Sequence, residues 1–385
     1  MSDYRNWNQD NEPLASKAFP DVSFPTNYQS ILDRIAAIDP TRYAKSRNFI
    51  DGSVTYLSPY ISRGVISTKQ VYDSLKERGF NLYQMEKMVS ELAWRDFFQR
   101  VWQSKEEGLF EDIRQPQPDV KTRELPAALP DASTGIDAVD KAIENLLETG
   151  YMHNHVRMYL SSIACNFAGA YWKKPSEWLY YHLLDGDLAS NTCSWQWVAA
   201  AFSGKKYYCN QDNISKYTGS NQKRSFLAAD YGSFPLETVP ETLQPTQAWL
   251  PVTNLPETPL PTIDPEKPLL LYTSYNLDPL WRKKEEANRV LLLEKEHFNQ
   301  FPISEKVLDF IQALGRDNIE GLQIYAGSLK DLPHLNSVPA IYSKEHPAFQ
   351  HFPGTKDARD WLVPQVSGYF SGFFGYWKKI EKYLK

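Results

Sequence analysis

Cysteine is scarce in this chain of 385 residues, and it does not occur in the patterns that carry cysteine chemistry. The three cysteines, Cys165, Cys193 and Cys209, form no CxxC pair. A sparse and odd-numbered set is typical of a reducing compartment and argues against a zinc or iron–sulfur framework. We therefore expect a cytoplasmic protein without a metal site.

Long apolar runs and an excess of positive charge are also missing. No segment approaches the roughly 18 consecutive apolar residues of a membrane span. The first residues, MSDYRNWNQDNEP, are polar and lack the basic start and apolar run of a secretory signal. The formal net charge is −5. Nucleic-acid binders are usually basic, so the overall charge argues against that class, although a local patch can still attract a polyanion.

Aromatic residues, in contrast, are abundant. Eleven Trp, 23 Tyr and 19 Phe bring the aromatic share to 14%. Aromatic side chains fill cores and interfaces first. Such a content also suits a protein that binds flat rings.

A proline-rich segment divides the chain. Nine prolines lie within residues 234–268. Proline lacks a backbone donor and fixes φ, so this segment is expected to be an extended linker. Since 385 residues are too many for one compact core, we predict a helical domain over 1–233, the linker, and a small α/β domain over 269–385.

The two predicted domains differ in their apolar patterns. Before the linker, a spacing near 3.6 predicts helices at 28–38, 67–79, 81–104, 135–150 and 153–172. Ser67 or Thr68 is the expected N-cap of the second helix, and Gly150 is expected to end the fourth. After the linker, short apolar runs predict strands at 268–274, 322–328 and 339–343, and we expect helices at about 280–300, 304–317 and 365–385. The fold class is therefore mainly α, with a small C-terminal α/β layer.

The stretch ELAWRDFF places three chemically different side chains on one helix face. Glu91, Trp94 and Arg95 are three and four residues apart, so they point the same way. Together they suit a floor for a base or a phosphate. The alternative is a surface pair between Glu91 and Arg95 with Trp94 in the core, and these eight residues alone favour it.

The stretch TGYMHNHVRM raises a similar choice. A helix that starts near His153 would bring Asn154, Arg157 and Met158 together. His153 and His155 suggest a metal, but two residues apart they lie on different faces of a helix, which argues against a shared ion.

The stretch DGDLASNTCSWQW holds two carboxylates around a glycine. Asp185 and Asp187 could bind a metal, clamp a cofactor or, for Asp187, cap the following helix. On that helix Asn191 and Trp195 are four residues apart and share a face, while Trp197 is expected to pack. These residues alone leave the three readings of the acids open.

Taken in order, and together with LSPYISRGVIS at 57–67, these stretches resemble the flavin-binding domain of the photolyase/cryptochrome family. The resemblance runs from about Tyr43 to Cys209. It implies an all-helical domain that holds FAD in a folded form. It also implies repair of a cyclobutane pyrimidine dimer, flipped out of DNA and split by an electron from excited, reduced FAD. The alternative within the family is a cryptochrome-like blue-light photoreceptor.

The resemblance also assigns roles by position. The implied FAD-binding residues are Tyr43, Thr55, Leu57, Ser58, Arg95, Arg157, Asp185, Asp187 and Asn191. The implied catalytic residues at the dimer and the flavin are Glu91, Trp94, Asn154, Met158 and Asn191. The residues implied in DNA binding are Arg47, Glu91, Trp94 and Tyr151. Trp195 and Trp172 match the electron-transfer chain, whose third tryptophan, expected near 115–125, is not evident.

One departure from the family is large. Its members usually begin with an α/β antenna domain, whereas here the flavin domain starts almost at Met1, as in short photolyase-like proteins. We therefore expect FAD as the cofactor and no antenna pigment. The expected partner is UV-damaged DNA, with single-stranded DNA as a further hypothesis, and a monomer is the default.

Overall fold

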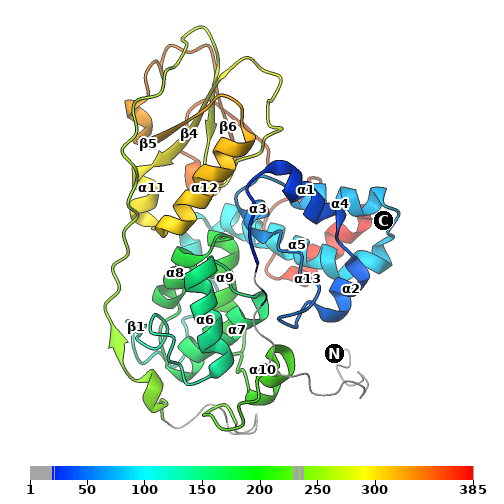
Figure 1. Ribbon diagram of the computed structural model, residues 1–385, viewed down its shortest axis with the longest axis vertical. Helices are drawn as coiled ribbons and strands as arrows, with labels where there is room; N and C mark the ends of the chain where they lie inside the picture. The colour runs from blue at the N-terminus through cyan, green and yellow to red at the C-terminus, as the bar shows by residue number, and fades with distance from the viewer. Residues whose placement is uncertain (1–19, 21, 229–233, 235–237, 385) are drawn as a thin grey trace.

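The computed structural model describes residues 20, 22–228, 234 and 238–384 (Figure 1). The part before the proline-rich segment is helical. Its α-helices are α1 (Tyr28–Ala36), α2 (Pro40–Ser46), α3 (Ser58–Ser62), α4 (Thr68–Glu77), α5 (Leu82–Lys105), α6 (Asp137–Thr149), α7 (Asn154–Ser162), α8 (Lys173–His182), α9 (Leu188–Val198) and α10 (Gln211–Thr218). The predicted helices are confirmed, except that α7 continues only through a π-helical turn to Phe167. None of the described helices is long and apolar enough to cross a membrane.

The predicted caps take part in these helices. The Ser67 side chain accepts a hydrogen bond from Gln70 N at 3.0 Å and starts α4. Gly150 ends α6 with a φ of 75°. A Cβ there would lie 2.7 Å from Leu184 Cγ. Glycine is therefore required both by the left-handed backbone and by the neighbouring side chain.

The α/β part is built on a parallel sheet with the strand order β5-β4-β3-β6-β7. Its elements are β3 (Leu269–Tyr272), β4 (Asn288–Glu294), α11 (Lys295–Gln300), α12 (Glu305–Asn318), β5 (Leu322–Gly327), β6 (Ile341–Lys344) and β7 (Thr355–Asp357). The order runs outward from β3 in both directions, as in doubly wound folds. In such sheets the carboxyl ends of the two central strands open a crevice.

Two helix predictions in this part were wrong. Residues 280–300 contain β4, and only 295–300 are helical. A run of valine and leucine that is buried on both faces has no period that separates strand from helix. The helix predicted over 365–385 is only Phe373–Ile380, α13, since Gly368 has a φ of 87° before it. The sheet also makes a mainly α class too narrow: the chain has a helical part and a parallel α/β part.

The predicted linker and the C-terminus both return to the helical part. Strand β1 (Leu125–Pro126) pairs with β2 (Thr246–Gln247) from the linker. Residues 359–384, here called the C-terminal segment, leave the sheet and pack along α5: Leu362 N donates to Asp96 Oδ2 at 2.8 Å, and Arg100 Nη2 donates to the Val366 carbonyl at 3.1 Å. The domain bounds at 234 and 269 stay a prediction. The C-terminal segment lies after residue 269 but packs on α5, which lies before residue 234.

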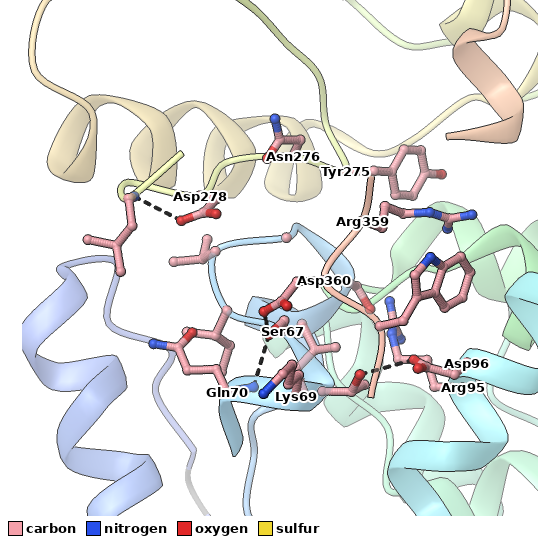
Figure 2. A pocket seen from close by; sticks show the side chains of 18 of the residues that line it. Ser67, Lys69, Gln70, Arg95, Asp96, Tyr275, Asn276, Asp278, Arg359 and Asp360 are labelled. Carbon is pink, nitrogen blue, oxygen red and sulfur yellow. Dashed lines mark hydrogen bonds between the residues drawn. The ribbon is translucent and has the colours of Figure 1, made fainter. Parts of the chain in front are cut away.

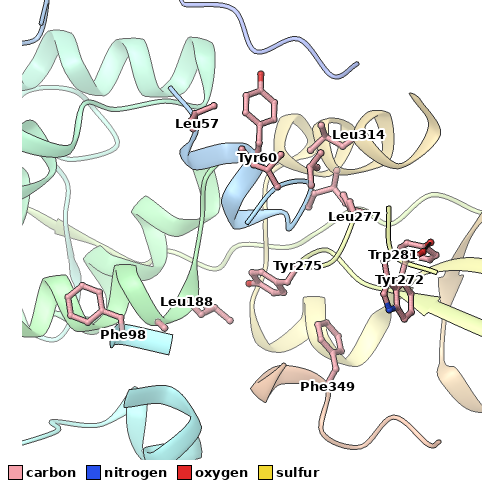
Figure 3. Packing of buried hydrophobic residues seen from close by; sticks show 14 of the residues in the cluster. Leu57, Tyr60, Phe98, Leu188, Tyr272, Tyr275, Leu277, Trp281, Leu314 and Phe349 are labelled. Carbon is pink, nitrogen blue, oxygen red and sulfur yellow. Dashed lines mark hydrogen bonds between the residues drawn. The ribbon is translucent and has the colours of Figure 1, made fainter. Parts of the chain in front are cut away.

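The helical and α/β parts share one hydrophobic core (Figure 3). Leu277 N donates to the Arg63 carbonyl at 3.0 Å, and the hydroxyls of Tyr180 and Tyr275 lie 2.6 Å apart. Gly64 permits this approach, since a Cβ on it would lie 2.3 Å from the Tyr275 carbonyl oxygen. The sheet is thereby held against the helices that carry the candidate site.

A buried histidine in this core makes stability sensitive to acid. His297 is 5% exposed, and burial, followed by the charges of Arg63 and His351, lowers its pKa to about 3. Its stabilising effect is complete above the unfolded pKa of about 6.5 and is lost as the pH falls toward 3. We expect His297→Leu to remove about 2 kcal/mol of the loss in unfolding free energy between pH 7 and pH 5. Urea unfolding at both pH values measures this change in free energy, and His334→Asn, at an exposed histidine, is the control. If the unfolding free energy falls equally between pH 7 and pH 5 in the wild type and in His297→Leu, His297 is not the source of the acid sensitivity.

Candidate functional site

Glu91, on α5, carries a carboxyl that forms an ion pair with an arginine. Its side chain is 41% exposed, and desolvation nevertheless raises the pKa of its carboxyl. Arg47 Nε donates to Glu91 Oε1 at 3.4 Å. Burial, followed by the charge of Glu91, also raises the pKa of the Tyr43 hydroxyl, since Tyr43 of α2 lies near Glu91.

Arg95 does not pair with Glu91, although the eight residues ELAWRDFF alone favoured a surface pair between them. Its Nη2 lies 3.0 Å from Asp187 Oδ2, to which Gln99 Nε2 also donates at 2.6 Å. Asp187 is 3% exposed and in addition caps α9, accepting from Ser190 N at 2.7 Å. The predicted cap is therefore confirmed, and the same carboxylate also pairs with Arg95.

Asp185 pairs with the other predicted arginine. Arg157 Nη2 lies 2.9 Å from both carboxylate oxygens. Arg157 Nε also donates to the Met152 carbonyl at 2.8 Å, and its guanidinium lies 5.7 Å from the Tyr151 ring centroid. The two acids around Gly186 are thus each held by an arginine from a different helix. Among the described residues no group of three or more His, Cys, Asp or Glu could hold a metal ion.

The segment before α3 has an unusual backbone. Tyr56 has a φ of 52°, a conformation that costs energy in an aromatic residue and is often found at functional sites. Its ring packs on Tyr151 at 5.4 Å between centroids. The neighbouring Thr55 accepts from Leu57 N at 3.4 Å, and Ser58 begins α3. Tyr43 and Thr55 both line a cavity of about 280 Å³.

The start of α7 lies beside Arg47. Burial, followed by the charges of His155 and Arg157, lowers the pKa of His153 to about 4, and a hydrogen bond to the Arg47 backbone offsets part of this. His153 Nδ1 accepts from His155 N at 3.2 Å and caps the helix, so it has a structural partner. Asn154 is exposed and Met158, one turn later, is half-buried.

Trp94 has a neighbour that the sequence did not suggest. Phe373 of α13 stacks on its ring at 3.9 Å between centroids and 8° between planes. Phe98 and Phe97 of α5 surround the pair at 5.3 and 5.7 Å. More than 270 residues separate Trp94 from Phe373, so only the folded chain brings them together.

Two polar side chains near the start of α9 differ in their hydrogen bonds. Asn191 Nδ2 donates to the Ser176 carbonyl at 2.9 Å, so its amide oxygen faces elsewhere. The Ser190 hydroxyl is buried and has no hydrogen-bond partner within the described part of the chain. A buried unpaired hydroxyl is costly unless a ligand or water satisfies it.

The predicted electron-transfer residues are deeply buried. Trp195 and Trp172 are 1% and 0% exposed. Trp172 Nε1 donates to Asp112 Oδ1 at 2.7 Å, and the Tyr171 hydroxyl reaches the same oxygen at 3.2 Å. The Tyr171 ring lies 5.6 Å from that of Trp172. Among residues 115–125, where the third tryptophan was expected, there is none, and Tyr171 is the aromatic neighbour next to Trp172.

A second, larger cavity of about 710 Å³ lies between the sheet and the helices (Figure 2). Arg95 and Asp187 reach it from the helical part, so part of the predicted FAD-binding set opens toward the α/β part. On the other side it is lined by Asn276, which follows β3, by Lys344, at the end of β6, and by Arg359. Sequence reasoning missed these three residues, because nothing but the strand order brings them together.

Comparison with known proteins agrees with this arrangement. A family model described as the FAD binding domain of DNA photolyase matches residues 88–226. These residues are similar to that domain. They include the part of α5 that carries Glu91 and Arg95, and the DGD turn with both carboxylates.

The relatives of the photolyase-type domain are longer proteins. The deoxyribodipyrimidine photo-lyase of Synechococcus sp. is 32% identical over 184 residues, which is 45% of this chain and 37% of that protein. The enzyme of the same name from Thermus thermophilus is 33% identical over 163 residues, 41% of this chain and 38% of its own. A Synechocystis sp. cryptochrome structure covers 51% of this chain and 44% of its own at 24% identity, with a TM-score of 0.45. The chain thus matches well under half of each relative.

The residues present fit FAD. Two half-buried arginines are fixed by buried carboxylates, and the buried hydroxyl of Ser190 has no hydrogen-bond partner among the described residues. Arg95, Arg157, Asp185, Asp187 and Asn191 would hold the flavin. The site therefore combines fixed charges with an unpaired polar group, which suits a ring system with hydrogen-bonding edges.

Proposed function

We propose that this protein repairs cyclobutane pyrimidine dimers in DNA under blue light. The observation that carries the proposal is the position of Glu91, whose carboxyl pairs with Arg47. Glu91 stands on the same helix as Trp94 and Arg95, and Arg95 pairs with Asp187 of the photolyase-like segment. Bound, reduced FAD would supply the electron that opens the dimer.

The residues of the chain divide the remaining work. Glu91 accepts a hydrogen bond from a pyrimidine that has been flipped out of the strand, and Trp94 packs against the base rings. Asn154 and Met158 contact the dimer from the start of α7. Arg47 pairs with Glu91 when no DNA is bound, and its side chain, which is 25% exposed, can reach a phosphate of the damaged strand.

A light-dependent assay tests this proposal. The purified protein should show flavin absorbance and, after reduction, should remove dimers from an oligonucleotide under blue light but not in darkness. Single-stranded and duplex substrates at the same salt concentration are compared, since a single strand needs less energy for base flipping. A flavoprotein that changes its absorbance in light but leaves the dimers intact would support the photoreceptor alternative instead.

Trp172 provides a separate prediction about electron transfer. Light-driven reduction of the bound oxidised flavin, with an external reductant present, should be several-fold slower in Trp172→Phe. The ring it removes is fully buried and bound to Asp112. Trp197→Phe is the matched control, because Trp197 belongs to α9 and is 41% exposed. Reduction of the flavin lowers its visible absorbance. If this absorbance falls at the wild-type rate in both variants, Trp172 is a packing residue.

A further inference from the structure

The C-terminal helix α13 carries exposed rings and lysines on its outer face. Phe374 is 81% exposed, whereas its neighbour Phe373 is 5% exposed and packs on Trp94. Lys378 and Lys379 are exposed on the same helix, and Lys382 and the 53% exposed Tyr383 follow in the next turn. Exposed rings that gather with lysines at one end of the described chain indicate a binding surface.

This outer face continues from the candidate site. The rings of Trp94 and Phe373 are stacked at 3.9 Å, and those of Phe373 and Trp377 at 6.0 Å and 26°. Phe374 lies 5.8 Å from Phe373. A series of rings therefore leads from the predicted base platform on α5 to the surface of α13, and Figure 1 shows the two helices side by side.

The helix is held firmly enough to act as a platform. Tyr376, a buried residue of α13, packs on Phe97 with 6.0 Å between the ring centroids. After the helix, the Leu384 carbonyl accepts from the Tyr72 hydroxyl at 2.8 Å, and before it Val366 is bound to Arg100. The rings of α13 are thus presented on a fixed backbone, which lowers the entropic cost of binding.

The chemistry of this face selects its partner. Three lysines, with Glu381 as the one acid between Phe373 and Leu384, attract a polyanion despite the chain's net charge of −5. Aromatic rings beside lysines are a pattern by which proteins bind single-stranded nucleic acid, since each unpaired base offers a face for stacking. In a duplex those faces are hidden by neighbouring bases, so the rings of α13 would have nothing to stack on.

We propose that the outer face of α13 docks the single-stranded DNA that flanks the damaged bases at Trp94. The proposal deepens the repair function and rests on it for the position of the dimer. The bases beside the lesion stack on Phe374 and Trp377, and their phosphates lie along Lys378, Lys379 and Lys382.

Binding measurements with full-length variants test this. Anisotropy of a labelled single-stranded oligonucleotide, with and without a dimer, should show at least about fivefold weaker binding for Phe374→Ala. Replacing both Lys378 and Lys379 by Ala should reduce the slope of log K against log salt by about 1.4. The matched controls, Tyr83→Ala at a 90% exposed ring and the exposed pair Lys283 and Lys284 changed to Ala, should bind as the wild type does.

Three results would overturn the docking proposal. They are wild-type affinity in both α13 variants, an equal loss of affinity in the control variants, and a loss of duplex binding as large as the loss of single-strand binding. Failure of the repair function is distinguishable, because it appears as intact dimers after illumination of the wild-type protein, whatever the oligonucleotide affinities are.

Discussion

Asp185→Ala is expected to release FAD and to destabilise the protein by about 3 kcal/mol. The substitution leaves the half-buried Arg157 guanidinium without the carboxylate that lies 2.9 Å away, and an unpaired charge in a partly buried site is costly. The Arg157 side chain would also lose its orientation toward the flavin. Urea unfolding gives the change in free energy, and the ratio of flavin to protein absorbance gives the occupancy.

A surface pair and a double substitution control this prediction. Glu111 lies 3.5 Å from Lys173, with side chains that are 72% and 36% exposed, so Glu111→Ala should change the unfolding free energy by less than about 1 kcal/mol. Arg157→Ala combined with Asp185→Ala should be less destabilising than the sum of the single changes. An Asp185→Ala protein with wild-type stability and full flavin content would show that the pair does not form the site.

Glu91→Ala is expected to reduce the affinity for dimer-containing DNA or the repair yield by at least about tenfold while FAD stays bound. The carboxyl pairs with Arg47, whereas Arg95 and Arg157, which would hold the flavin, pair with Asp187 and Asp185. Glu91→Gln, which keeps the shape and one acceptor, should retain more activity than Glu91→Ala. Repair yield at saturating DNA and affinity in darkness are measured separately.

The control for this change lies on the same helix. Glu86 is exposed, five residues before Glu91, and Glu86→Ala should repair at the wild-type rate. If Glu91→Ala instead loses its flavin, Glu91 belongs to the cofactor side of the site and its assignment to the dimer is wrong.

Much of the helical part was predictable because its sequence is locally consistent. Apolar spacing, the Ser67 cap and the Gly150 ending each follow from nearby residues, so the pattern alone places those helices. The sheet was harder. The buried run in β4 is apolar on both faces, and β7 has only three residues; neither carries a period that separates strand from helix.

The roles that the resemblance assigned to the site residues stay a prediction, and the structure adds partners that the sequence did not indicate. The motif assigned Arg95 and Asp187 to one pocket, and they lie 3.0 Å apart. The prediction that Asp187 caps a helix is also correct, because one carboxylate accepts from both Ser190 and Arg95. The stacking of Phe373 on Trp94 had no local signal, since it depends on how the C-terminal segment returns from the sheet to α5.

The repair function is tested most directly by the number of dimers removed per bound, reduced FAD in a single-stranded oligonucleotide under blue light. We expect repeated turnover in light, none in darkness, and a yield that falls in Glu91→Ala at unchanged flavin content. Intact dimers after illumination of the reduced, FAD-loaded wild-type protein, on both single and double strands, would contradict it.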